Sequence, residues 1–161
     1  MKKLVLQIAL LVLSIEVRAQ EDWSIHLERA HNQIEYCETF YNLMLEHKDD
    51  DSTASGYYAL ASMMLAKKYK NPFTKLSYFN KGKTLLEDAI ENDKGNIELR
   101  FLRFAVQNEV PPILLYFNNM EEDKEMLDDF IRKNTSPLAN RIITYFNKKN
   151  IDYMMASGLA Y

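Results

Sequence analysis

The sequence predicts an all-α protein: a single domain of about six antiparallel helices, forming a helical bundle or a short stack of helix pairs. The 161 residues include only four Gly and four Pro, so loops must be few and short, which disfavours small β-sandwiches and barrels. Apolar residues recur at helical spacing, and no strand-like alternation competes with them. With 47% apolar and 27% charged residues, the composition excludes a mainly disordered, collagen-like or polytopic membrane protein.

Residues 1–19 have the layout of a secretory signal peptide. The chain starts with the basic segment Met1-Lys2-Lys3, continues with a mainly apolar stretch at residues 4–13, and has Val17 and Ala19 at positions −3 and −1 of the expected cleavage site. The apolar stretch has roughly half of the ~20 residues that a membrane-spanning helix needs. We therefore expect export and cleavage, rather than an uncleaved anchor or a buried amphipathic helix.

Cleavage leaves one all-α domain at residues 20–161, located in the periplasm or outside the cell and without stable membrane insertion. Three basic residues and one acidic residue are lost with residues 1–19, so the net charge changes from −3 to −5. An acidic domain offers no broad basic field, and we expect no binding to nucleic acid or anionic lipid. Cys37 is the only cysteine, so no internal disulfide forms, and it should be a small buried hydrophobe.

The first two helices are expected over residues 24–46 and 53–70. Between them, Asp49-Asp50-Asp51-Ser52 reads as a solvated polar loop. The spacing of apolar residues gives each helix one stripe that can face a core. The stripe of the first helix consists of Trp23, Leu27, Ala30, Ile34, Cys37, Tyr41, Met44 and Leu45.

The next two helices are bounded by strong terminal signals. Asn71-Pro72 starts the third, because Pro suits the first helical position after an Asn cap. Gly95 is expected to end it as a left-handed C-terminal cap. Asn96 then caps the fourth helix, residues 97–108, which Pro111-Pro112 ends. Apolar residues cover most of this fourth helix, which is therefore expected to be central.

The last part of the chain predicts two more helices. Residues 113–117 form an apolar stretch, either one helical turn or a buried extended piece. Asn119, followed by Glu122, has the pattern of a capping box at the start of the fifth helix. Ser136-Pro137 starts the sixth, which is expected to continue to about Ser157.

Residues 78–96 resemble the second helix and exit turn of a tetratricopeptide repeat. Lys94 stands where that repeat usually has Pro, and the preceding helix at 57–70 lacks the family's full pattern. Over residues 57–108 the resemblance implies a stack of helix pairs. The small, large and small packing positions of the repeat are matched by Gly82, Leu86 and Ala89.

A second resemblance involves three segments: residues 96–104, the Val-Pro-Pro at 110–112, and the Asn-Asn-Met-Glu-Glu-Asp-Lys at 118–124. Together they resemble a family of exported, uncharacterised Gram-negative bacterial proteins. The resemblance implies export and a helical fold. The family has no assigned activity, so nothing about a reaction follows.

The fourth helix carries one polar stripe, made by Arg100, Arg103 and Gln107. Arginines on a central helix need partners, because an unpaired buried charge is costly. The acidic segment Glu121-Glu122-Asp123 at the start of the next helix can supply them through bidentate ion pairs. The alternative is that the stripe opens on a groove and binds an anion or a peptide carboxylate.

Ten tyrosines, eight methionines and eight phenylalanines are unevenly distributed, with Tyr36, Phe40 and Tyr41 on the first helix and Tyr57 and Tyr58 on the second. Such residues are favoured at recognition surfaces, since they combine a large contact area with a polar or adaptable tip. The alternative is core packing with the hydroxyl groups at the rim.

We expect no metal site, cofactor or catalytic residue. Glu28 and His31 have the Glu-x-x-His spacing of di-iron bundles, but no second copy exists to complete the site. The acidic loop at 49–51 lacks the spacing of a calcium loop. Phosphate-binding loops, Gly-x-Ser-x-Gly, His-Glu-x-x-His and Cys-x-x-Cys motifs do not occur.

The function we expect is a non-catalytic exported helical module that binds a protein or peptide partner. The alternatives are a carrier of an apolar ligand between helices and a hydrolase that uses carboxylates. A partner module should expose a concave surface with accessible Tyr and Arg, a carrier should enclose an apolar cavity of at least ~300 Å³, and a hydrolase should show two acids converging in a cleft. The candidate binding residues are Arg100, Arg103, Gln107, Tyr57 and Tyr58.

Overall fold

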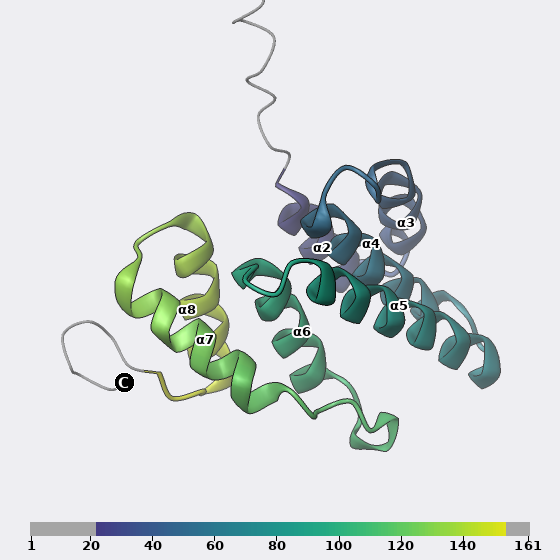
Figure 1. Ribbon diagram of the computed structural model, residues 1–161. Coiled ribbons are helices and arrows are strands. Elements are labelled where there is room, and N and C mark those ends of the chain that lie inside the picture. Colours follow the sequence, from purple (N-terminus) through teal and green to yellow (C-terminus); the bar gives the residue numbers. More distant parts are fainter. Residues whose placement is uncertain (1–21, 154–161) are drawn as a thin grey trace, which may run out of the picture.

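The computed structural model describes residues 22–153, and these form a single all-α domain without a strand (Figure 1). The expected signal peptide and the predicted end of the last helix beyond residue 153 lie outside the described residues. The α-helices are α2 (Trp23–Asn32), α3 (Tyr36–His47), α4 (Ser52–Leu65), α5 (Pro72–Asn92), α6 (Ile97–Glu109), α7 (Met120–Lys133) and α8 (Pro137–Lys149). Two short 3₁₀ turns are η1 (Ala66–Lys68) and η2 (Pro112–Leu114).

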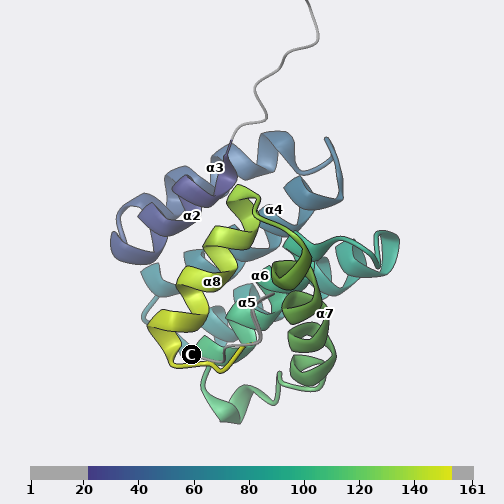
Figure 2. The same cartoon turned by 90° about the vertical axis from the view of Figure 1, so that its left-hand side faces the viewer.

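Each helix from α2 to α8 packs against the next one along the chain, most extensively α4 with α5 and α3 with α4. The helix α4 also contacts α2 and α6. Figure 1 shows α7 and α8 on one side of α6 and helices α2 to α5 on the other. In the turned view of Figure 2, α2 and α3 lie at one end of the molecule and the loop between α6 and α7 lies at the opposite end.

The α4–α5 pair is the most extensive contact in the fold, and Gly82 makes it possible. A Cβ atom at this position would lie 2.5 Å from the carbonyl oxygen of Ala59 on α4. The missing side chain therefore lets α5 approach the backbone of α4 closely. Gly56 and Ala61 of α4 are also buried, and a Cβ atom at Gly56 would meet the side chain of Leu99 on α6. The helix α4 is therefore covered on more than one side.

Two hydrophobic clusters hold the domain, and α6 joins them. Leu99 and Leu102 belong to the larger cluster, which α2 to α6 form together. Phe104 belongs to the smaller one, together with side chains of α7 and α8 such as Leu127 and Phe146. The sequence predicts a central position for this helix, and its neighbours on both sides bear that out.

Helix starts follow the predicted caps closely. The side chains of Asn71, Asn96 and Ser136 accept hydrogen bonds from the first-turn amides of α5, α6 and α8. Asp51 also caps a helix, because its carboxylate accepts from the amide of Ala54 at 2.7 Å. The acidic loop thus starts α4 in addition to separating two helices. Asn119 makes no side-chain cap bond, so the predicted capping box is absent.

The expected first helix is two helices, because the chain is extended at Gln33 between α2 and α3. The thiol of Cys37 donates to the carbonyl oxygen of Ala30 at 3.4 Å, which ties the two helices together. Both α2 and α3 contact α4, which a single straight helix of that length would not achieve. No Gly or Pro marks the break, so helical periodicity alone could not reveal it.

Two other predicted features differ from the structure, and a third matches one of its two alternatives. The helix α5 ends at Asn92, and Gly95 lies beyond it without the expected left-handed backbone. The last helix ends at Lys149, where Asn150 supplies a left-handed cap, rather than near residue 157. For the stretch 113–117, expected as one helical turn or a buried extended piece, the structure has the short 3₁₀ turn η2, and Ile113, Leu115 and Phe117 are exposed.

Candidate functional site

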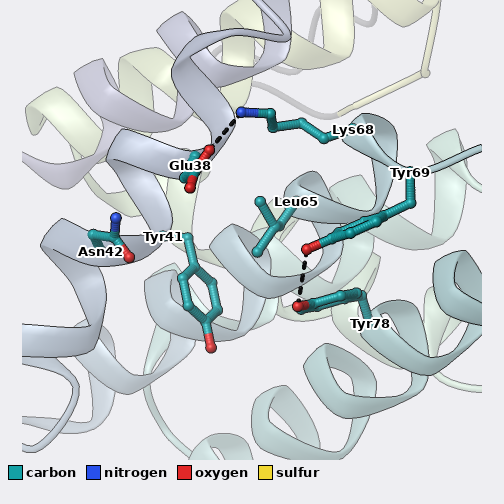
Figure 3. A pocket seen from close by; sticks show the side chains of 7 residues that line it. All are labelled: Glu38, Tyr41, Asn42, Leu65, Lys68, Tyr69 and Tyr78. Carbon is teal, nitrogen blue, oxygen red and sulfur yellow. Dashed lines mark hydrogen bonds and ion pairs between the residues drawn. The ribbon is translucent and has the colours of Figure 1, made fainter.

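An open hollow of about 390 Å³ lies between α3, the end of α4 and the first half of α5 (Figure 3). We call it the tyrosine groove. Its walls combine aromatic rings, one aliphatic side chain and an ion pair. The lining residues are Glu38, Tyr41, Asn42, Leu65, Lys68, Tyr69 and Tyr78.

The turn between α4 and α5 brings two of these tyrosines together. After Leu65 the helix tightens into η1, and Tyr69 is extended before Asn71 starts α5. The ring of Tyr69 then stacks on that of Tyr78, with centroids 5.0 Å apart and planes 12° apart. Their hydroxyl oxygens are 3.2 Å apart, and Figure 3 shows both hydroxyl groups pointing into the groove. The pair forms a flat aromatic wall with a polar edge.

A second tyrosine pair shares one ammonium group. The Nζ atom of Lys81 donates to the hydroxyl oxygens of Tyr41 and Tyr58, at 2.9 Å each, and these oxygens are 3.1 Å apart. The same Nζ lies 5.2 and 5.1 Å from the two ring centroids, which is within cation–π range. Of its three donors, one remains for another acceptor.

The pKa values of the two phenols that share this ammonium group shift in opposite directions. The hydrogen bonds from Lys81 and with Tyr58 hold the pKa of Tyr41 below its ordinary value. Burial raises the pKa of Tyr58, whose side chain is almost fully covered. Tyr41 is therefore the more acidic phenol; it lines the groove, and its hydroxyl group accepts from Lys81.

The opposite wall of the groove carries an ion pair between Glu38 of α3 and Lys68 of η1, with Nζ and Oε2 2.6 Å apart. The hydrogen bond from Lys68 lowers the pKa of Glu38. Both side chains are exposed, so the pair contributes little to stability. With Lys81 beside it, the groove carries more positive than negative charge.

Arg100 and Arg103 lie at a different place and are buried, with exposed fractions of 7% and 3%. Asp123 of α7 is fully covered and accepts from both, at 3.1 Å from Arg100 and at 2.7 Å from Arg103. Glu122 pairs with Arg100 at 3.0 Å and Glu87 of α5 with Arg103 at 2.7 Å. We call these five residues the arginine cluster.

The predicted acidic segment of α7 thus does pair with the two arginines, whereas Glu87 was not foreseen. Burial alone would lower the pKa of Arg103, but its hydrogen bonds and its attraction to Asp123 and Glu87 outweigh burial and raise it. A shallow hollow of about 330 Å³ lies over the cluster, but Glu87 and Glu122 line it. An incoming anion would meet these carboxylates, so we assign the arginines a structural role.

The remaining candidates are separated from one another. Tyr57 is buried and donates to Glu98 at 2.6 Å, while Arg141 of α8 donates to both of them. Burial and the charge of Glu98 raise the pKa of Tyr57. This network joins α4, α6 and α8 and leaves no free hydroxyl group. Gln107 is buried, and neither polar atom of its amide finds a hydrogen-bond partner among the described residues.

Of the five candidate residues, only Tyr58 lies next to the tyrosine groove; it does not line the groove but bonds Tyr41 and Lys81. Tyr69, Tyr78 and Lys81 were missed, although Tyr78 and Lys81 are three residues apart and must share one flank of a helix. That spacing was a usable signal. Nothing in the sequence shows that Tyr41 of another helix lies opposite them.

Within residues 22–153, no three His, Cys, Asp or Glu side chains lie close enough to form a metal site. No helix in the same part of the chain has the length and apolar character needed to cross a membrane. No protein-family model matches the sequence, and no curated protein or solved structure is significantly similar to it.

Proposed function

We propose that this protein is a non-catalytic, exported module that binds a segment of a partner protein in the tyrosine groove. The observation that carries the proposal is the open groove itself, which is lined by Tyr41, Tyr69 and Tyr78. Lys81 lies beside it and donates to the hydroxyl group of Tyr41. Tyrosine side chains give large contact areas at low entropic cost and are enriched at recognition surfaces.

The charge of the groove favours an acidic segment. Lys81 keeps one donor after serving Tyr41 and Tyr58, and the only acid among the lining residues, Glu38, is already paired with Lys68. A carboxylate that enters between the two tyrosine pairs would accept from Lys81. The rings of Tyr69 and Tyr78 would then pack against the neighbouring side chains of the segment.

The arrangement of the helices is consistent with the tetratricopeptide-like interpretation. Each helix contacts the next one along the chain, and α4 also contacts α2 and α6. Gly82 lies at the close approach between α5 and α4, which is where the resemblance places a small residue. Stacks of this kind expose long surfaces suited to extended partners.

The two other functions find less support. A carrier needs an enclosed apolar cavity, whereas the tyrosine groove is open and half polar. A hydrolase needs two acids in one cleft, and Glu38 is single there, with its pKa lowered rather than raised. We therefore retain the partner-binding function as the conclusion.

Site-specific photocrosslinking of the mature protein tests this function. A photoreactive residue at position 42, which lines the groove, is compared with one at the exposed position 133 on α7, in an extract of the native cell envelope. We expect a discrete adduct only from position 42, and its loss in the variants Lys81→Met and Tyr69→Ala. Equal adducts from both positions, or an adduct that neither variant changes, would refute the proposal.

A further inference from the structure

The tyrosine groove has an excess of ammonium donors over carboxylate acceptors. The Nζ atom of Lys68 carries three donors and gives one to Glu38, while that of Lys81 keeps one after its two hydrogen bonds to phenols. Tyr69 and Tyr78 share a single hydrogen bond, so one of their two hydroxyl groups still has a proton to donate. Glu38 is the only carboxylate among the lining residues. The groove therefore favours a segment that brings acceptors, such as unpaired backbone carbonyl groups.

The apolar part of the groove is a floor between two aromatic walls. Figure 3 shows Leu65 between Tyr41 on one side and the stacked pair of Tyr69 and Tyr78 on the other. Leu65 is only 6% exposed, whereas Tyr69 is 36% exposed and stands beside it. Aromatic rings on either side of an apolar floor suit compact apolar groups, of which the pyrrolidine ring of proline is the most rigid that a polypeptide offers.

Both aromatic walls are held in place without a partner. The rings of Tyr69 and Tyr78 stack with centroids 5.0 Å apart, and their hydroxyl groups contact each other. On the other wall, the hydroxyl group of Tyr41 lies 3.1 Å from that of Tyr58 and accepts from Lys81. A preorganised site loses little conformational entropy on binding, and it gains most from a ligand that is rigid as well.

The backbone form of the partner segment follows from what the groove lacks. Residues 22–153 contain no strand, so the segment cannot extend a sheet there. An amphipathic helix needs a hydrophobic groove, and Leu65 is the only aliphatic side chain among the described lining residues. A phosphorylated segment is typically held by arginines, and none of the lining residues is an arginine. The fourth mode is a polyproline II segment, whose carbonyl groups have no internal partners and which docks in aromatic-lined grooves.

We infer that the segment bound in the tyrosine groove is an acidic, proline-rich segment in the polyproline II conformation. The inference rests on the proposed partner-binding function and specifies its ligand. Proline rings pack over Leu65 between the two aromatic walls, and the carbonyl oxygens next to them accept from tyrosine hydroxyl groups. A glutamate or aspartate of the segment accepts from Lys81. Because proline has no N–H group, each one adds an acceptor without adding a donor.

Isothermal titration calorimetry of the mature full-length protein tests the inference with synthetic peptides. The probe is a capped nonapeptide of three Pro-Pro-Glu repeats, which places its carboxylates along one edge of a helix with three residues per turn. One counterpart replaces every proline by alanine, and the other replaces every glutamate by glutamine. We expect the probe to bind at least about tenfold more tightly than the alanine counterpart, since that peptide is less rigid and has no rings to pack.

The contribution of charge is measured with the glutamine counterpart and the variant Lys81→Met. The glutamine counterpart should bind the parent protein about fivefold less tightly than the probe at low salt, and added salt should reduce this difference. Lys81→Met should bind the probe and the glutamine counterpart with nearly equal affinity. A preference for the probe that persists unchanged in Lys81→Met would contradict the contact between Lys81 and the acidic residue.

The aromatic contact is tested with Tyr69→Ala, which should weaken binding of the probe by at least about tenfold. The matched control is Phe73→Ala, because Phe73 is an aromatic residue on α5 that is 81% exposed and does not line the groove. The control should bind like the parent protein. Proton NMR adds a direct readout, since stacking on a tyrosine ring shifts the signals of the proline ring upfield, and Tyr69→Ala should reduce that shift.

Equal affinity for the probe and the alanine counterpart, no binding of the probe, or an equal loss in Phe73→Ala would overturn the inference. Mass spectrometry of the photocrosslinked adduct from position 42 separates it from the proposed function. An adduct whose crosslinked segment lacks proline would leave partner binding standing and show that the polyproline II ligand is wrong. Absence of both the adduct and peptide binding would overturn the two proposals together.

Discussion

The arginine cluster and the tyrosine groove are both polar arrangements built from three helical segments, but one is closed and the other open. In the arginine cluster, two guanidinium groups face three carboxylates, and Asp123 is completely covered. In the tyrosine groove, Lys81 faces two hydroxyl groups and solvent. Charges that satisfy each other in the interior fix helix angles, whereas a cation left with a spare donor at the surface is available to a partner.

Removing the centre of the arginine cluster should have the largest effect. In Asp123→Ala, Arg100 and Arg103 lose their shared carboxylate while remaining buried. We expect the free energy of unfolding to fall by about 3–5 kcal/mol, because two cations are left poorly compensated. Urea denaturation followed by circular dichroism measures it.

The control for this variant is Asp129→Ala, which removes an exposed carboxylate paired with Arg132 and Lys133 on the same helix. This variant should lower the free energy of unfolding by less than about 1 kcal/mol. Equal losses in the two variants would mean that the arginine cluster is no more important to the fold than a surface ion pair.

The next effect concerns the contact that aligns α4 with α5 beneath the tyrosine groove. In Gly82→Ala, the new Cβ atom would lie 2.5 Å from the carbonyl oxygen of Ala59, and the helices must separate. We expect a loss of about 1–3 kcal/mol in the free energy of unfolding, even though Ala is the better helix former.

Gly95→Ala is the matched control for this substitution, since a Cβ atom there meets nothing within 4 Å and the backbone is not left-handed. Thermal unfolding of both variants compares them directly. If Gly82→Ala were as stable as Gly95→Ala, the close approach of α5 to α4 would not depend on the missing side chain.

Lys81→Met should change the chemistry of the groove with little effect on stability. The ammonium group is exposed, so we expect a change of under about 1 kcal/mol in the free energy of unfolding. The pKa of Tyr41 should rise, because the hydrogen bond from Lys81 is the main cause that lowers it. Spectrophotometric titration of the phenols measures the rise.

Lys75→Met removes a lysine of the same helix that has no partner, and it should leave the titration of Tyr41 unchanged. An unaltered titration in Lys81→Met would contradict the contact between its ammonium group and the two hydroxyl groups. A large loss of stability in that variant would instead place Lys81 with the arginine cluster, as a structural cation.

The contrast between the closed arginine cluster and the open tyrosine groove also explains which features could be predicted from the sequence. Asn71, Asn96 and Ser136 act locally, within one helical turn, so their capping roles could be predicted. The pairing of Arg100 and Arg103 with Asp123 was also predictable, since buried charges require partners and the next helix starts with acids. These features depend on short-range geometry or on a strong energetic demand.

The features that were missed depend on tertiary arrangement. The break at Gln33 has no sequence marker, because it serves the simultaneous packing of α2 and α3 on α4. The tyrosine groove needs Tyr41 of α3 opposite Lys81 of α5, and weak surface interactions do not demand a particular partner. Leu115 was placed in a possible buried segment, because its apolar character gives no hint of exposure.

The smallest expected effect is at the ion pair on the other wall of the groove. The pKa of Glu38 lies below its ordinary value because of the hydrogen bond from Lys68. A carboxylate with a lowered pKa in the folded state favours folding at neutral pH, and this contribution is lost as the pH falls through that pKa. Lys68→Met should return the titration of Glu38 to the ordinary range of an exposed glutamate.

Carbon-detected NMR titration of the Glu side chains resolves this shift, and Lys48→Met is the control because Lys48 contacts Asp49 instead. The control should leave Glu38 titrating as in the parent protein. If Lys68→Met also left the titration of Glu38 unchanged, Glu38 would be an unpaired acid opposite Lys81. The net charge of the groove would stay positive, but an unpaired Glu38 would repel an acidic segment and make an acidic partner less favourable.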